Sequence, residues 1–402
     1  MTEIFSKALD RTIHVERFIG KLKGKTPGPT IVFFGGIHGN ETAGVFALNN
    51  VFEKIKNLPI NGAVYGISGN LSALKVNQRF IKQDLNRLWI NGNMESLTTK
   101  DRLSIEEEEQ QRLFEILQDI LQNESGPFYF IDLHTTSSET LPFITINDAL
   151  INRKFSSQFP VPIVLGIEEY LDGPLLSYIN QLGYVSLGFE SGQHDALNAV
   201  TNGEAFIYLS LIYTGILDKK HIPNYERFET ILEEESESIK DIFEVTYLYK
   251  LHEGEKFMMK SNYESFQNIR KGDVLATSEG KEIVSPSTAK LFMPLYQNKG
   301  KEGFFIIKKI HPFFLKLSEL LRRVKMDTLL VALPGIKWQN KHEGVLRVNL
   351  RVTKYLAKQI FHLFGYRNKQ IDATHVYLFN RERTSKTKSY NNLSWYKKNR
   401  FR

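Results

Sequence analysis

Residues 30–48 read TIVFFGGIHGNETAGVFAL and join two elements of different type. The apolar run Ile31–Phe34 predicts a buried strand, and the two glycines that follow it predict a turn. A helix is expected to begin a few residues later, so His38 and Glu41 lie where the strand passes into the helix. Their separation of three residues allows both side chains to reach one point.

A second polar strand end lies in residues 128–136, FYFIDLHTT. The run Phe128–Leu133 predicts another buried strand, with His134 at its carboxyl end. In open α/β sheets, ligands bind in the crevice outside the carboxyl ends of the strands. Two imidazoles and one carboxylate in that place are typical of a mononuclear zinc hydrolase, in which water takes the fourth ligand position. A His-x-x-Glu pair alone has little specificity, but the joint pattern favours a metal site.

Two acids near these strand ends have a chemical interpretation of their own. Glu190 ends the apolar run Tyr184–Phe189, and apolar surroundings raise the pKa of a carboxylic acid, as a proton shuttle requires. The alternative is a strand-end glutamate that caps the next helix. Asp132 is expected to orient a ligand imidazole or to cap the turn.

Residues 84–87 read DLNR and suit the binding of a carboxylate. The guanidinium of Arg87 is a planar fork that pairs with a carboxylate through two hydrogen bonds, and Asn86 adds a neutral donor beside it. The alternative is an ion pair of Arg87 with Asp84 or with a surface acid.

Apolar strand-like runs alternate with helical patterns from Thr30 to about Leu217, which predicts an α/β layer fold with helices on both faces. The clearest helical pattern is Ser104–Leu121. The expected strands are Ile31–Phe34, Ala63–Ile67, Phe128–Leu133, Phe143–Ile146, Pro162–Leu165 and Val185–Phe189.

The remaining chain changes character twice. Phe243–Tyr249 and Asp273–Ile310 are rich in β-forming residues and turns and predict a small β domain, whereas Pro312–Val324 and Val352–Leu363 have helical spacing. We therefore expect a catalytic domain (residues 1–220), a linker with a small β domain (221–312) and a helical extension with a basic tail (313–402).

Four motifs stand in order along the chain: GGIHGNE (35–41), DLNR (84–87), DLHTT (132–136) and FESG (189–192). Together they resemble the succinylglutamate desuccinylase/aspartoacylase family, a branch of the zinc carboxypeptidase-like hydrolases. The resemblance runs from about residue 28 to about residue 310 and implies a central mixed sheet with helices on both faces. It also implies that His38, Glu41 and His134 bind one zinc ion per chain.

The same resemblance implies roles for the other candidate residues. Glu190 would be the general base that takes a proton from the water activated by zinc and returns it to the departing amine. Asn86 and Arg87 would hold a carboxylate of the substrate. The small β domain would lie against the cleft and narrow it in favour of small acyl amino acids.

The chain departs from the aspartoacylase pattern at one position. Members of that branch carry an arginine that polarises the scissile carbonyl shortly after the asparagine that corresponds to Asn70, and this chain has Ser72 there. Either zinc alone stabilises the oxyanion, or another cation such as Arg79 reaches in.

The composition of the 402 residues limits the chemistry and the partners. The absence of cysteine excludes disulfides and thiolate ligands. Residues 381–402 hold eight Lys or Arg and one Glu, which accounts for the net charge of +7. Aromatic residues are interleaved with these charges, a pattern that can bind nucleic acid, but a solvated or docked tail is the expected interpretation. The tail aromatics are Tyr390, Trp395, Tyr396 and Phe401.

The sequence start lacks the apolar core of a signal peptide, and the longest apolar stretch, Ala205–Tyr213, is too short to span a bilayer. We expect a cytoplasmic protein with a small-molecule substrate and no membrane or nucleic-acid partner, and leave a homo-oligomer open.

The predicted activity is zinc-dependent hydrolysis of the amide bond of an N-acyl amino acid of the N-succinyl or N-acetyl type. One alternative is a zinc carboxypeptidase that acts on peptides or cell-wall fragments. The other is a non-catalytic protein that binds nucleic acid through its basic tail.

Overall fold

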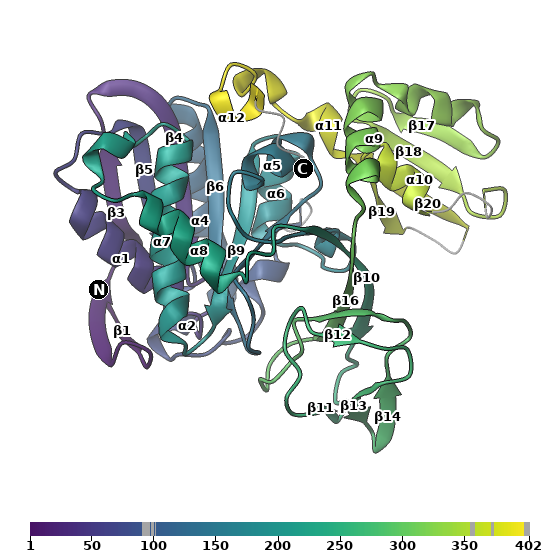
Figure 1. Cartoon of the computed structure of the whole chain (residues 1–402), viewed down its shortest axis with the longest axis horizontal. Coiled ribbons are helices and arrows are strands. Elements are labelled where there is room, and N and C mark those ends of the chain that lie inside the picture. The colour runs from purple at the N-terminus through teal and green to yellow at the C-terminus, as the bar shows by residue number, and fades with distance from the viewer. Residues whose placement is uncertain (91–96, 98–99, 101, 354–357, 371–373, 398–402) are drawn as a thin grey trace.

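The computed structural model describes residues 1–90, 97, 100, 102–353, 358–370 and 374–397. Within these ranges the main feature is an eleven-stranded mixed sheet in the order β12-β15-β16-β10-β8-β7-β9-β6-β4-β5-β3 (Figure 1). Its strands from the first 220 residues are β3 (Phe18–Lys23), β4 (Thr26–Gly35), β5 (Asn61–Ser68), β6 (Phe128–Thr136), β7 (Phe143–Ile146), β8 (Ile163–Leu165) and β9 (Val185–Gln193). A separate hairpin is formed by β1 (Thr2–Ser6) and β2 (Arg11–Val15).

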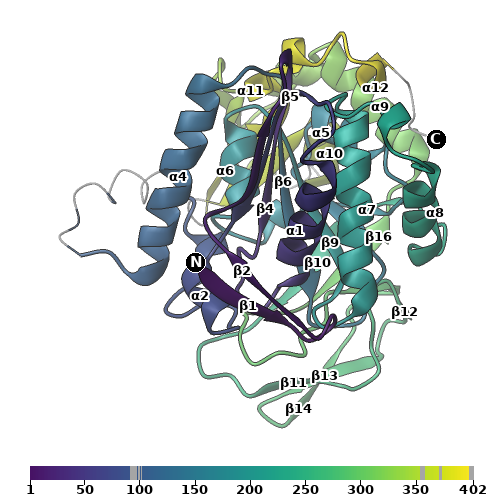
Figure 2. The same ribbon diagram turned by 90° about the vertical axis from the view of Figure 1, so that its left-hand side faces the viewer.

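Helices cover both faces of this sheet, as Figure 2 shows. In the described ranges, no helix combines the length and the apolar character that a membrane crossing requires. The helices up to residue 235 are α1 (Ala43–Ile55), α2 (Leu71–Lys75), α4 (Ile105–Asn123), α5 (Leu150–Ser156), α6 (Leu175–Gln181), α7 (Leu197–Tyr213) and α8 (Glu226–Glu235), with short 3-10 turns η1 (Leu85–Arg87), η2 (Ile167–Glu169) and η3 (Lys219–His221).

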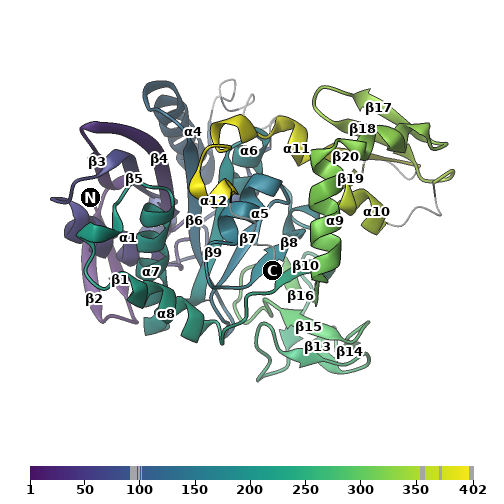
Figure 3. The same cartoon turned by 45° about the horizontal axis from the view of Figure 1, so that its top comes forward.

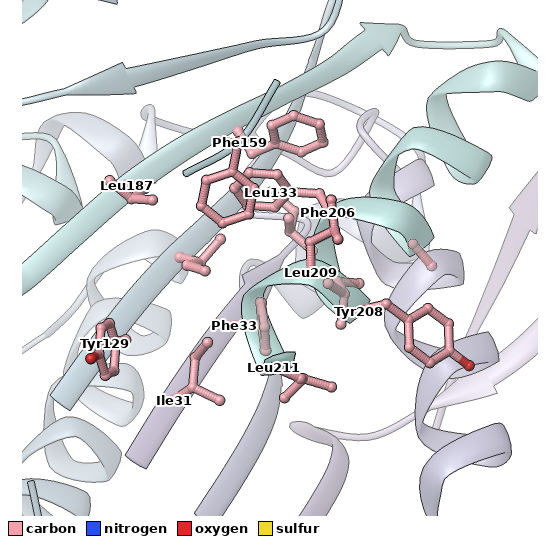
Figure 4. Packing of buried hydrophobic residues seen from close by; sticks show 14 of the residues in the cluster. Ile31, Phe33, Tyr129, Leu133, Phe159, Leu187, Phe206, Tyr208, Leu209 and Leu211 are labelled. Atoms are coloured by element: carbon pink, nitrogen blue, oxygen red, sulfur yellow. The ribbon is translucent and has the colours of Figure 1, made fainter. Parts of the chain in front are cut away.

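Strand β4 shows why the sheet needs helices on both faces. Successive side chains of a strand point to opposite sides. Ile31 and Phe33 belong to an apolar core with α1 and α7, whereas Val32 and Phe34 belong to a second core with α4 and α6. Figure 4 shows the first core at close range, where Ile31 and Phe33 lie near Leu211. Burial on both sides explains why the strand is a continuous apolar run in the sequence.

The six strands predicted from the sequence are all present, and Ser104 caps the predicted helix α4 through a capping box with Glu107. Strands β5, β4, β6 and β9 are parallel neighbours. The carboxyl ends of β4, β6 and β9 therefore lie side by side at one edge of the sheet, as the sequence predicts for a ligand site.

The small β domain is present, and part of it continues the large sheet. Strand β10 (Ile242–Lys250) pairs in parallel with β8 and antiparallel with β16 (Glu302–Lys309). The domain thus reaches the edge of the sheet near the strand ends named above. Its other strands are β11 (Phe257–Met259), β12 (Asn268–Ile269), β13 (Val274–Ser278), β14 (Lys281–Val284) and β15 (Ala289–Phe292).

The prediction that residues 313–402 form a helical extension is wrong in part. Helix α9 (Pro312–Arg323) is present, but a four-stranded sheet in the order β17-β18-β20-β19 follows it. These strands are only five or six residues long, and β18 begins with two consecutive buried residues, so they give little of the alternation by which a strand is predicted from sequence. The elements are η4 (Met326–Ala332), β17 (Ile336–Asn340), β18 (Val345–Asn349), α10 (Lys358–Leu363), β19 (Tyr366–Gln370) and β20 (His375–Asn380). Of the helix expected at 352–363, residues 354–357 lie outside the described ranges.

The basic tail packs against the first 220 residues, as Figure 3 shows for α11 (Arg381–Thr384) and α12 (Ser394–Lys397); between them lies η5 (Thr387–Ser389). Tyr390 is fully buried and donates a hydrogen bond to the carbonyl of Phe128 at 2.5 Å. Trp395 donates from Nε1 to the hydroxyl of Tyr129 at 3.1 Å. These two aromatic rings are therefore core residues and offer no stacking face to a nucleic acid; Phe401 lies outside the described ranges.

Candidate metal centre and active site

His38 and Glu41 lie in the turn between β4 and α1. Gly36 makes this turn with a φ of 72°, a conformation that favours glycine. Gly39 lets the backbone pass close to Ala73, because a Cβ atom there would lie 2.1 Å from the Ala73 carbonyl carbon. The local sequence thus brings the His38 and Glu41 side chains back over the end of the sheet.

His134 and Glu190 come from the next two strands. His134 lies near the carboxyl end of β6 and is in register with Glu190 on β9. Both residues are 8% exposed. The two parallel strands therefore present an imidazole and a carboxyl group next to each other at the same edge.

The three predicted ligands converge on one point. Glu41 bridges the two imidazoles, with Oε1 2.7 Å from His38 Nδ1 and Oε2 2.9 Å from His134 Nδ1. One donor atom from each of these side chains lies within 4.8 Å of the others. Two imidazole nitrogens and a carboxylate are a donor set that zinc binds in catalytic sites.

The far nitrogen of each imidazole is held by a carboxylate. His38 Nε2 lies 3.1 Å from Asp84 Oδ1, and His134 Nε2 lies 2.7 Å from Asp132 Oδ2. A protonated Nε2 leaves the Nδ1 lone pair free to bind a metal, so these bonds favour the ligand tautomer. The orienting role predicted for Asp132 is supported by this contact, whereas Asp84 is an addition to the predicted site. The position of Asp84 in the sequence, three residues before Arg87, does not predict a contact with His38.

Neighbouring charges shift the pKa values of two of the candidate metal ligands, Glu41 and His134. Burial would raise the pKa of Glu41, but His38 and His134 hold it well below its usual range. Burial would lower the pKa of His134, but Asp132 and Glu41 hold it well above its usual range. The Glu41 carboxylate is therefore ionised at neutral pH, as a metal ligand must be.

Glu190 has the environment that a proton shuttle requires. Its Oε2 is buried and has no hydrogen-bond partner among the described residues. Burial raises its pKa to about 8; the nearby Glu41 and Asp132 add to this, and His134 opposes it. A carboxyl group with a pKa near neutrality can both take up and return a proton.

The positive charge beside the candidate metal ligands comes from Arg79. Ser72, which stands where the aspartoacylase pattern has an arginine, does not supply one. Arg79 lines the same pocket as Glu41, with Nη1 3.5 Å from Glu41 Oε1 and Nη2 3.1 Å from Asp84 Oδ2. Ser72 instead bonds to Glu109 through both its amide and its hydroxyl. Of the two alternatives that the sequence left open, the geometry favours a second cation beside the metal ligands.

Asn86 and Arg87 also line this pocket, at the turn η1. Asn86 Oδ1 accepts a hydrogen bond from the amide of Leu175 at 2.9 Å, which fixes the side chain. Arg87 Nη2 pairs with Glu302 Oε1 of β16 at 3.0 Å, not with Asp84. The ion pair joins the predicted substrate-binding arginine to the small β domain.

All six predicted site residues thus line one pocket, of about 130 Å³. The pocket is well below the roughly 300–1,000 Å³ of sites for drug-sized ligands, so its size suits a small substrate. Its members from the sequence analysis are His38, Glu41, Asn86, Arg87, His134 and Glu190.

Comparisons with known proteins find similar sequences. Residues 27–202 match the model of the succinylglutamate desuccinylase/aspartoacylase catalytic domain. The chain is 28% identical over 167 residues to a probable aspartoacylase of Acaryochloris marina and 28% identical over 133 residues to a succinylglutamate desuccinylase of Serratia proteamaculans. These matches cover 38% and 30% of this chain, and 52% and 39% of the relatives.

Solved structures show the same fold. A succinylglutamate desuccinylase/aspartoacylase of Rhodobacter sphaeroides superposes with a TM-score of 0.54 at 16% identity, over 72% of this chain and 88% of that one. A succinylglutamate desuccinylase of Vibrio cholerae gives a TM-score of 0.52 at 16% identity, over 77% and 91%. Residues 27–202 of this chain are therefore similar to the catalytic domain of the succinylglutamate desuccinylase/aspartoacylase family.

Proposed function

We propose that this protein is a metal-dependent deacylase that hydrolyses the amide bond of an N-acyl amino acid, with zinc as the metal. The observation that carries the proposal is the convergence of His38, Glu41 and His134 on one point, with Glu190 in register beside them. The match of residues 27–202 to the family's catalytic domain and the names of the relatives support the reaction class.

Each candidate site residue has its own role in the proposed reaction. His38, Glu41 and His134 would hold the zinc ion, which supplies Lewis-acid polarisation of the acyl carbonyl and makes water acidic enough to attack at neutral pH. Glu190 takes a proton from the attacking water and delivers it to the amine that leaves.

Two arginines place the substrate in this proposal. Arg79 donates to the acyl oxygen as negative charge develops there, since its guanidinium is held beside Glu41 by Asp84. Arg87 and Asn86 bind the carboxylate of the amino acid. Because Glu302 occupies one edge of the Arg87 guanidinium, the substrate carboxylate uses the other nitrogens or displaces that ion pair.

The carboxypeptidase alternative is less well supported by the pocket. A volume of about 130 Å³, closed on one side by Leu295 and Phe305 of the small β domain, fits one amino acid with a short acyl group better than a peptide. The nucleic-acid alternative loses two of its four candidate stacking groups, because Tyr390 and Trp395 are buried.

The test combines metal content with activity. Purified protein should contain about one zinc per chain by elemental analysis and release free amine from N-acyl amino acids. The Glu190→Gln variant should keep the metal and lose about 10²- to 10⁴-fold in kcat, the range for a general acid–base group. A protein that binds zinc but hydrolyses only peptides would support the carboxypeptidase alternative, and one that binds no zinc after supplementation would contradict the mechanism.

A further inference from the structure

The cations that line the active-site pocket in the described residues are few, and they already have partners. Besides the two histidines, only Arg79 and Arg87 carry a positive charge there. Arg79 is bonded to Asp84 and approaches Glu41, and Arg87 is paired with Glu302. One of them, Arg87, has the position to bind a substrate carboxylate, so a substrate with a second or third carboxylate finds no further cation.

Much of the remaining wall is apolar. Side chains from β7, η2, α6, β16 and the loop before β16 supply this surface. The residues are Ile146, Ile167, Leu171, Leu176, Leu295 and Phe305. Such a wall favours burial of a methylene chain by about 0.8 kcal/mol per CH₂ and disfavours an ionised carboxylate.

A single acid, Glu168, interrupts the apolar wall formed by η2 and α6. It follows β8, which stands three places from β6 in the sheet and runs antiparallel to β6 and β9. Glu168 therefore follows a strand that ends away from the edge where the metal ligands lie, although it lines the same pocket.

One oxygen of Glu168 is bonded and the other is not. Oε1 accepts the amide of Asp148 at 3.1 Å and lies 3.8 Å from Nε of Arg367. Oε2 is buried and has no hydrogen-bond partner in the described part of the chain, although the side chain is only 2% exposed. Arg367 makes its shorter bond to Asp148, at 2.7 Å. A buried carboxylate oxygen without a donor is costly unless a ligand supplies one.

We propose that the pocket selects an N-acyl amino acid with one carboxylate and an apolar side-chain stem that ends in an ammonium group, which Glu168 binds. The inference rests on the deacylase function proposed above and names its substrate class. Arg87 binds the carboxylate, the apolar wall covers the methylene stem, and Glu168 receives the ammonium at the far end.

The C-terminal extension (residues 313–402) contributes a residue next to Glu168. Glu168 also lines a second cavity, of about 930 Å³, whose lining includes Arg367 and Arg381. Arg367 comes from β19, so the four-stranded sheet of the extension supports Glu168 from behind.

The experiment compares kcat/KM of the zinc-loaded protein for Nα-acetyl derivatives of lysine, ornithine, norleucine, aspartate and glutamate, and for Nα-succinylglutamate. We expect the two basic amino acids to exceed norleucine by about 10- to 100-fold, the range of a buried hydrogen bond to a charged group, and the acidic ones to be slowest. Preference for an acidic or an apolar amino acid would overturn the inference while supporting the deacylase. No hydrolysis of any compound would overturn the deacylase and the inference with it.

Two variants separate recognition from a structural role. Glu168→Gln keeps the size and the acceptor for Asp148 and should lower the ratio of kcat/KM for Nα-acetyllysine over Nα-acetylnorleucine by about 10- to 100-fold, mainly through KM. Glu169→Gln is the matched control, because Glu169 pairs with His362 and does not line the active-site pocket. An unchanged ratio in Glu168→Gln, or an equal change in Glu169→Gln, would overturn the role of Glu168.

Discussion

Two buried carboxylates, Glu41 and Asp148, invite comparison because each is surrounded by nitrogen donors. Glu41 is 2% exposed and bridges two imidazoles, while Asp148 is fully buried and accepts hydrogen bonds from Arg153, Arg322 and Arg367. Burial would raise the pKa of both, yet the neighbouring cations hold both well below the usual range. By pKa alone the two carboxylates are alike.

The two carboxylates differ in what their clusters face. Asp148 joins arginines of α5, α9 and β19, and so ties the extension to the first 220 residues. The Glu41 cluster opens on a pocket in which Glu190 keeps an unpartnered oxygen. The comparison teaches that a strongly shifted pKa reports the burial of charge, and that the pocket on which the Glu41 cluster opens is what distinguishes a candidate site, since Arg153 Nη1 and Arg367 Nε beside Asp148 also lack partners among the described residues.

The largest expected effect tests the Glu41 cluster, which opens on the active-site pocket. Glu41→Gln removes the charged ligand but keeps the shape of the side chain, so zinc content should fall below about one tenth per chain. Hydrolysis should drop by more than about 10³-fold, since several kcal/mol of transition-state stabilisation depend on the metal. Elemental analysis and amine release measure both. Normal zinc content in a folded Glu41→Gln protein would contradict the ligand assignment.

Substitution of Asp148 should instead lower the stability of the fold. Asp148→Asn leaves three buried arginines without their shared counter-charge and should lower the free energy of unfolding by about 3–5 kcal/mol. Urea unfolding followed by tryptophan fluorescence measures the loss. Zinc content of the folded fraction should match the parent protein, and a variant that loses zinc without losing stability would reverse the comparison.

An intermediate effect is expected at the carboxylates that orient the imidazoles. Asp132→Asn keeps a hydrogen-bond acceptor for His134 but removes the charge, and should weaken zinc binding by about 10- to 100-fold. Competition with a chromophoric chelator measures the affinity. Asp84→Asn is the parallel variant for His38, and an unchanged affinity in both would show that these contacts do not tune the metal.

The smallest effect is a pH dependence of stability. The folded-state pKa of Asp148 lies below that of the unfolded chain, about 3.9, so its ionisation stabilises the fold above that pH. The contribution is lost as the pH falls through the folded-state pKa. The gap in unfolding free energy between the parent protein and Asp148→Asn should therefore shrink from pH 6 towards pH 3. A constant gap would mean that the charge of Asp148 does not stabilise the fold.

The sequence predicts the inner site well because its parts are local. His38 with Glu41 and His134 with Asp132 each lie within a short segment at a strand end, and parallel strands bring such segments together. Glu190 follows from the same rule. The fold of the first 220 residues is predictable for the same reason, since its strands are long apolar runs.

The partners that the sequence could not predict come from distant segments. Glu302 pairs with Arg87 across 215 positions, and Arg322 reaches Asp148 across 174. The sequence around a single glutamate or arginine does not predict the residue with which it forms an ion pair. The sheet of the extension was missed because strands as short as Val345–Asn349 give too few positions to show an alternation of two.

The contact between Tyr129 and Trp395 also has a consequence for how the chain is made. The two residues are 266 positions apart, so β6, which carries His134, waits for its last core partner while those residues are synthesised. At about 5–20 residues per second, this interval lasts between about 13 and 53 s. During that time the aromatic surface behind β6 is uncovered on the ribosome, and the nascent chain needs protection from aggregation before the fold can close.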